Sequence, residues 1–159
     1  MRSIALGISV AIYIASLTMP CYSYGQQETV LGVDSVGTVY GGSLLLIGWM
    51  GVLSFEFAWF ANPLYLCACA GILASRKNPC NEGQAALLAL MPCFAIAFAL
   101  SFLMYRTTAA GGGPAGTEWV ITAYLPGYYL WIASMVALLL ASPTKRREGT
   151  AEDSNHDGL

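Results

Sequence analysis

Charged side chains are scarce in this chain of 159 residues: Asp, Glu, Lys and Arg make up only 10% of it, whereas a typical soluble domain has about 25%. Hydrophobic residues make up 57%, and the mean hydropathy is +0.60. So few charges cannot cover a folded surface in water. We therefore interpret the chain as an integral membrane protein with the lipid bilayer as a partner. The net charge of −2 and the lack of a basic patch exclude a nucleic-acid partner.

Groups that carry enzyme chemistry are also lacking. The single histidine, His156, lies in the polar tail, and the chain has no Gly-x-Ser-x-Gly, His-Glu-x-x-His or Gly-Lys-Ser/Thr motif. The five cysteines are odd in number and form no Cys-x-x-Cys pair. "DSNHDG", residues 153–158, matches the opening of a calcium loop but lacks the closing glutamate. The sequence therefore predicts a protein that is not an enzyme, with no cofactor and no metal site.

Long apolar runs are abundant, and a membrane-spanning helix needs about 20 apolar residues. Spans are expected at about 3–19, 56–75, 83–105 and 118–141. Residues 40–75 would form a helix of about 54 Å, too long for one span. We expect an interfacial or re-entrant helical piece at about 42–54 before the span. The alternative is two half-spans hinged at Asn62-Pro63.

The basic residues orient this arrangement, because cytoplasmic loops collect Lys and Arg. With both termini in the cytoplasm, six of the seven basic residues lie inside and only Arg106 lies outside. The expected fold class is therefore all-α: four transmembrane helices in a compact bundle over residues 1–142. Residues 143–159 are expected to form a disordered cytoplasmic tail. The first helix is expected to be an uncleaved anchor, with a cleaved signal peptide as the alternative.

Glu56 is the one carboxylate in the longest apolar stretch, within "SFEFAWFANP". An ionisable residue inside a membrane is a candidate functional group. The expected topology, however, places Glu56 near the outer end of its span, among aromatic residues that are typical of the membrane interface. Two interpretations stay open: an anchoring or capping role, and a substrate, ion or proton site.

Three motifs stand out: "GWMGVL" at 48–53, "FAWFANPL" at 57–64 and "GYYLWIAS" at 127–134. With them the chain resembles a set of small bacterial inner-membrane proteins, and the resemblance covers most of residues 46–137. It implies a multi-pass protein of the bacterial inner membrane, and it transfers no activity. The matching residues are Trp49, Trp59, Asn62, Pro63, Gly127, Tyr128 and Trp131.

Because catalytic groups are lacking, the first hypothesis is a non-enzymatic membrane protein that acts through protein–protein interaction, as a subunit, assembly factor or immunity-type protector. Its partner would be another membrane protein or a second copy of the chain. The alternative is a small transporter, channel component or lipid-binding protein that uses a Trp/Tyr cluster. The candidate binding residues are Glu56, Trp59, Asn62, Tyr128 and Trp131.

Overall fold

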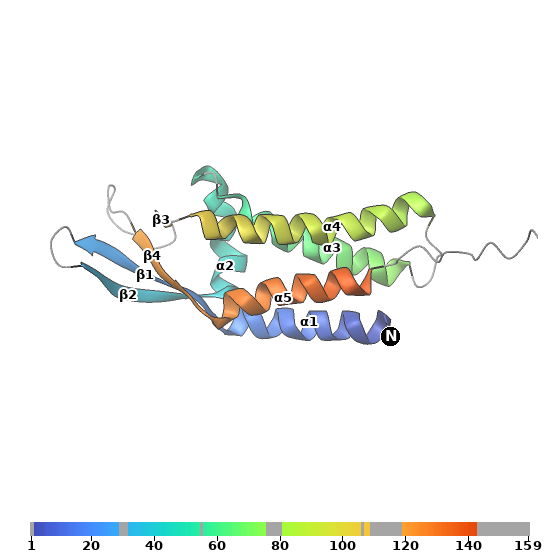
Figure 1. The fold of residues 1–159 in the computed structure, drawn as a ribbon, viewed down its shortest axis with the longest axis horizontal. Helices are drawn as coiled ribbons and strands as arrows, with labels where there is room; N and C mark the ends of the chain where they lie inside the picture. The colour runs from blue at the N-terminus through green and yellow to red at the C-terminus, as the bar shows by residue number, and fades with distance from the viewer. Residues whose placement is uncertain are drawn as a thin grey trace, which may run out of the picture.

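The structure is a computed structural model that describes residues 2–28, 32–54, 56–75, 81–105, 107–108 and 119–142. The expected tail, 143–159, and the basic residues Arg76, Lys77 and Arg106 lie outside the described residues. In the described part, helices occupy one end of an elongated molecule and a sheet occupies the other (Figure 1). The elements in chain order are α1 (Arg2–Thr18), β1 (Pro20–Glu28), β2 (Gly32–Tyr40), α2 (Gly41–Ile47), η1 (Gly48–Ser54), η2 (Phe57–Phe60), α3 (Ala61–Ala74), α4 (Glu82–Ser101), η3 (Phe102–Met104), β3 (Thr107–Thr108), β4 (Trp119–Tyr124) and α5 (Pro126–Ala141).

The fold is mixed α/β, so the predicted all-α bundle of four transmembrane helices is wrong. The sheet is antiparallel with strand order β2-β1-β4-β3. Its centre is β1, which pairs with β2 on one side and with β4 on the other. Within the described residues, only two helical segments are long and apolar enough to span a membrane, Phe57–Ala74 and Glu82–Met104. Length and composition alone do not separate such helices from the core helices of a soluble protein.

The expected span at 118–141 contains a strand and a helix rather than one helix. Trp119–Tyr124 is rich in β-branched and aromatic residues, which favour a strand, and it pairs with β1. Pro126 then occupies the first turn of α5, a position where its missing N–H costs nothing. The residue before it, Leu125, is extended, as expected for a residue that precedes proline. Because residues 118–141 are apolar throughout, hydropathy alone did not reveal the boundary between β4 and α5.

Residues 40–75 divide into several short elements. α2 and η1 cover 41–54, η2 covers 57–60, and α3 starts at Ala61. Asn62 and Pro63 lie in the first turn of α3, so this helix does not hinge there. Glu56 is extended and directly precedes η2, but its side chain makes no capping hydrogen bond.

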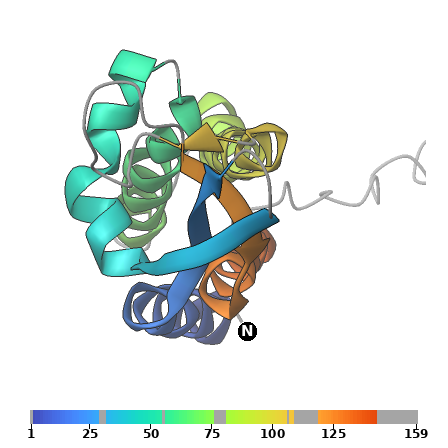
Figure 2. The ribbon, with the colours of Figure 1, turned by 90° about the vertical axis from the view of Figure 1, so that its left-hand side faces the viewer.

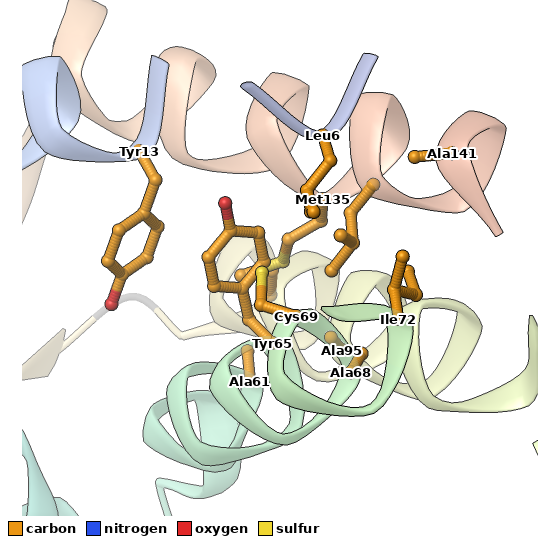
Figure 3. Close-up of a cluster of buried hydrophobic side chains, with 12 residues drawn as sticks. Leu6, Tyr13, Ala61, Tyr65, Ala68, Cys69, Ile72, Ala95, Met135 and Ala141 are labelled. Carbon is orange, nitrogen blue, oxygen red and sulfur yellow. The ribbon is translucent and has the colours of Figure 1, made fainter. Parts of the chain in front are cut away.

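The helices form two pairs, since α1 packs on α5 and α3 packs on α4. Near the sheet, α2 packs on α1 and lies at one side of the helices (Figures 1 and 2). One cluster of buried side chains, which includes Leu6, Ala68, Ile72 and Met135, joins α1, α3, α4 and α5 (Figure 3). A second cluster, formed by Cys21, Tyr22, Ala58, Phe102 and Tyr128, lies where the helices meet the sheet.

Candidate functional site

A pocket with a cavity volume of about 60 Å³, partly open at the surface, lies at the junction of the helices and the sheet. Segments from the whole described chain contribute to its wall, and most of the contributing side chains are apolar or aromatic. The lining residues are Ser16, Leu17, Cys21, Gly41, Leu44, Gly48, Glu56, Ala58, Trp59, Asn62, Phe102, Tyr128 and Trp131.

All five candidate binding residues from the sequence line this cavity: Glu56, Trp59, Asn62, Tyr128 and Trp131. The first three come from the start of η2 and α3, and the last two come from the first turns of α5. The pairing of β1 with β4 fixes the start of α5 beside the end of α1. The backbone N–H of Leu125 donates to the carbonyl oxygen of Cys21 over 2.8 Å. The sheet thereby positions one wall of the cavity.

Asn62 is the polar centre of the wall, with only 5% of its surface exposed. Its Oδ1 accepts a hydrogen bond from the Tyr13 hydroxyl at 3.1 Å and another from Trp131 Nε1 at 2.9 Å. An indole nitrogen can only donate, so the Asn62 amide must turn its oxygen, and not its nitrogen, toward Trp131. The amide thus ties α3 to α1 and to α5.

A second polar group continues from Asn62 into the helical core. The rings of Tyr13 and Tyr65 stack with centroids 4.4 Å apart, and both lie between α1 and α3 (Figure 3). The Tyr65 hydroxyl shares a hydrogen bond of 2.9 Å with Ser9 Oγ, which donates to the carbonyl oxygen of Ser134 at 2.7 Å. These buried hydroxyls are satisfied within the protein, so they position Asn62 rather than bind a ligand.

The aromatic wall is held by hydrogen bonds to the backbone. Trp59 Nε1 donates to the carbonyl oxygen of Leu45 at 3.0 Å, and the Trp59 ring lies against Gly48. The Tyr128 hydroxyl donates to the carbonyl oxygen of Ala99 at 2.8 Å. These bonds attach α2 to η2 and α5 to α4, so the rings are fixed before any ligand arrives.

Glu56 is the only charged residue among the lining residues. Its backbone N–H donates to the carbonyl oxygen of Gly51 at 2.8 Å, and its side chain lies against Gly51. A side chain at position 51 would press on the carboxylate, so the glycine leaves room for it. No Lys, Arg or His lines the cavity within the described residues.

The cysteine that lines the cavity is a poor nucleophile. Cys21 is buried, and burial raises the pKa of its thiol to about 11. A thiol that stays protonated at neutral pH is a poor nucleophile. In the part of the chain that the structure describes, no three His, Cys, Asp or Glu residues gather in a group that could hold a metal ion.

Sequence reasoning missed Tyr13, Ser9 and Ser16, although a signal was present. Their spacing of four and three residues places them on one face of a helix. Polar groups along one face of an apolar helix indicate buried partners. No pattern in the sequence marks Phe102 or Cys21 as a cavity residue. Both line the cavity because they lie where the helices meet the sheet.

Comparison of the chain with protein-family models, with curated proteins and with solved structures finds no match. The resemblance to small bacterial inner-membrane proteins therefore stays a prediction.

Proposed function

We propose that this protein is a non-enzymatic integral membrane protein that binds one amphipathic, lipid-like molecule, of which only one end enters the cavity at the helix–sheet junction. The observation that carries the proposal is the cavity itself. It combines apolar and aromatic walls with one buried amide, Asn62, and one carboxylate, Glu56. An apolar pocket with a few fixed polar groups is typical of ligand sites.

The surface of the helices supports a membrane location. Every helix from α1 to α5 exposes large apolar side chains, for example Leu140 at 77%, Leu46 at 75% and Ile4 at 67%. Exposed apolar surface of this extent is costly in water and favourable against lipid tails. The charged residues of these helices are Arg2 and Glu82, which start α1 and α4. Both lie at the end of the molecule away from the sheet (Figure 1).

The proposed orientation places this charged end in the cytoplasm and the sheet outside. In the sequence, Arg76 and Lys77 follow α3, and residues 145–147 follow α5 with three basic side chains. Cytoplasmic loops collect such residues. Together with the resemblance, this favours the bacterial inner membrane, with α3 and α4 crossing the bilayer and α1 and α5 packed beside them.

Native mass spectrometry of the protein purified in a mild detergent tests the binding proposal. Wild-type protein is expected to carry one lipid. In Leu44→Trp, a larger ring at a lining position occupies the cavity, so we expect lipid occupancy to fall at least tenfold. The matched control is Leu66→Trp on the exposed face of α3, which should keep wild-type occupancy. Equal occupancy in both variants would refute the proposal.

A second candidate is the interaction role that the sequence suggested. The observation that favours it is a group of exposed apolar side chains on α2 and η1, which project beside the cavity: Leu46, Ile47, Trp49 and Met50. A photoreactive amino acid at position 49 tests it in cells. A crosslink to one defined membrane protein, or to a second copy of the chain, would support this role; crosslinks to lipid alone would argue against it.

A further inference from the structure

The helical segment formed by α2 and η1 has an inner and an outer face with different surroundings. The inner face is fixed to the protein: a Cβ atom at Gly41 would collide with the backbone of Ser16, and Gly48 lies against the Trp59 ring. The outer face is exposed and consists of large apolar side chains. They are Leu46 at 75%, Ile47 at 57%, Trp49 at 54% and Met50 at 49% exposure.

The spacing of residues along the segment explains the two faces. Four residues at positions i, i+3, i+4 and i+7, which share one side of a helix, are buried or partly buried: Gly41, Leu44, Leu45 and Gly48. The same spacing starts again two residues later, about 200° around the helix. All four residues of this second set are exposed: Ser43, Leu46, Ile47 and Met50.

This segment carries no charge. Between Asp34 and Glu56 the sequence has no Asp, Glu, Lys or Arg. A helix that lies on a membrane usually turns a charged side toward water. Here protein covers the inner side, because α2 packs on α1 and η1 packs on η2. Neither side of the segment therefore requires water.

The composition of the outer face favours lipid over a protein partner. Helix–helix interfaces in membranes are enriched in small residues, which let backbones approach closely, whereas the side chains here are large. A protein interface also carries about one hydrogen bond per 100–200 Å². In the described part of the segment, the only polar groups on exposed side chains are the hydroxyl of Ser43 and the indole N–H of Trp49. Lipid tails require no polar partner, and an indole suits the boundary between tails and headgroups.

The direction of the segment also fits a lipid surface. α2 runs across the long axis of α1, α3, α4 and α5 (Figure 1), and α2 with η1 lies along one side of these helices (Figure 2). With the long helices in the bilayer, the segment lies in the membrane plane at the level of the helix–sheet junction. Exposed apolar side chains continue along the chain through Phe57 and Phe60 of η2 to Leu66 of α3.

We infer that α2 and η1 form an in-plane segment whose outer face lies in the lipid of the outer leaflet, at the boundary between headgroups and acyl chains. This inference rests on the proposed function and adds a surface of lipid contact outside the cavity. Leu44 and Gly48 of the same segment line the cavity, so the element in contact with lipid also forms one cavity wall. A photoreactive group at position 49 should accordingly reach lipid rather than a protein.

Spin labels on single cysteines in a cysteine-free background test the inference, with the full-length protein reconstituted in phosphatidylcholine vesicles. The test variants are Ile47→Cys and Met50→Cys. Thr38→Cys on β2 is the aqueous reference, and Leu66→Cys, near the middle of Phe57–Ala74, is the deep lipid reference; all four positions are exposed. The measurement is the ratio of label relaxation by oxygen, which concentrates in lipid, to relaxation by a water-soluble nickel chelate.

The ratios at positions 47 and 50 are expected to lie between the two references, because an interfacial helix is buried about 5–10 Å into the boundary of headgroups and acyl chains. A ratio equal to either reference would overturn the inference. Labels that neither reagent reaches would show that a second copy covers the face, and would overturn it as well.

Failure of the inference is distinguishable from failure of the proposed function. If Leu66→Cys gives the deep lipid ratio while positions 47 and 50 give the aqueous one, the inference is wrong and the membrane location stands. If Leu66→Cys itself gives the aqueous ratio, the proposed membrane location is wrong. The two test variants are judged separately, so poor folding of one leaves the other to decide.

Discussion

At the scale of single residues, Asn62 connects stability with recognition. The oxygen of its amide joins three helices, and the residue lines the cavity. The hydroxyl of Tyr13 supports this arrangement from α1, and its ring stacks on Tyr65. The position of Asn62 is therefore set by the core of the helices rather than by a loop.

Tyr13→Phe should destabilise the protein while keeping its ring stack. Loss of one buried hydrogen bond costs about 1 kcal/mol, which lowers the melting temperature by about 2–4 °C for a protein of this size. Tyr129→Phe is the matched control, because this tyrosine is exposed. Thermal unfolding followed by circular dichroism measures both. Equal melting temperatures for the two variants would contradict the importance of the Tyr13 hydroxyl.

Cys21 makes the stability depend on alkaline pH. Burial in the folded protein raises the pKa of its thiol from its ordinary value of about 9 to about 11. The unfolded chain therefore loses this proton first, and the contribution of Cys21 is complete below pH 9 and lost as the pH rises toward 11. The melting temperature of the wild type should fall more between pH 8 and pH 10.5 than that of Cys21→Ala. Parallel decreases would exclude this effect.

At the scale of elements, the close approach of α2 to the end of α1 forms one side of the cavity. The N–H of Gly41 donates to the carbonyl oxygen of Met19 at 3.1 Å. A Cβ atom at Gly41 would collide with the backbone of Ser16 and Leu17. Backbone cannot move aside as a side chain can, so only glycine fits at the start of α2.

Gly41→Ala should therefore displace α2 and lower the stability by about 2 kcal/mol, as overpacking of a tight contact does. Gly7→Ala is the control within α1, because a Cβ atom there has no neighbour within 4 Å. That variant should be as stable as the wild type or more stable, since alanine favours a helix. Thermal unfolding compares them. A stable Gly41→Ala protein would contradict the close contact.

The sequence predicted the helices better than the sheet, for a physical reason. Helix formation depends on local apolar runs, and α1 and α4 lie close to the expected 3–19 and 83–105. Although β1 pairs with the neighbouring β2, its pairing with β4 depends on a partner far away in the chain: Tyr22 of β1 lies opposite Tyr124 of β4. Polar residues such as Gln26 and Gln27 gave β1 the composition of a loop. Strand pairing of this range leaves little local signal.

The candidate site was likewise only partly predicted: several of its residues were identified from the sequence, but the cavity that they share was not. Trp59, Asn62 and Trp131 stood out because polar and amphipathic side chains are conspicuous in apolar runs. Their shared cavity could not be predicted, because it requires α5 to start beside β1. The sheet that the sequence did not reveal is thus the element that brings the distant residues together.

At the scale of the whole molecule, the proposal divides the chain into helices in the bilayer and a sheet outside it. The cavity then lies near the outer membrane–water boundary, where an amphiphile has its polar end. Trp59 and Tyr128 suit this depth, since Trp and Tyr are enriched at membrane interfaces. Position in the membrane and ligand chemistry support each other.

The orientation predicts a labelling pattern for single cysteines in a cysteine-free background. Thr38→Cys lies on β2 and is exposed, so a membrane-impermeant maleimide should label it from outside intact cells. Glu82→Cys, at the start of α4, should react only after the cells are permeabilised. The reverse pattern would contradict the proposed orientation.

A photoactivatable lipid, crosslinked to the protein in membranes and mapped by peptide mass spectrometry, decides between the cavity and the general lipid-facing surface. Binding in the cavity predicts saturable crosslinks to lining residues such as Leu44, Trp59 and Phe102. Crosslinks confined to exposed residues such as Leu66, Leu90 and Phe94, without saturation, would show ordinary bilayer contact and contradict the proposal.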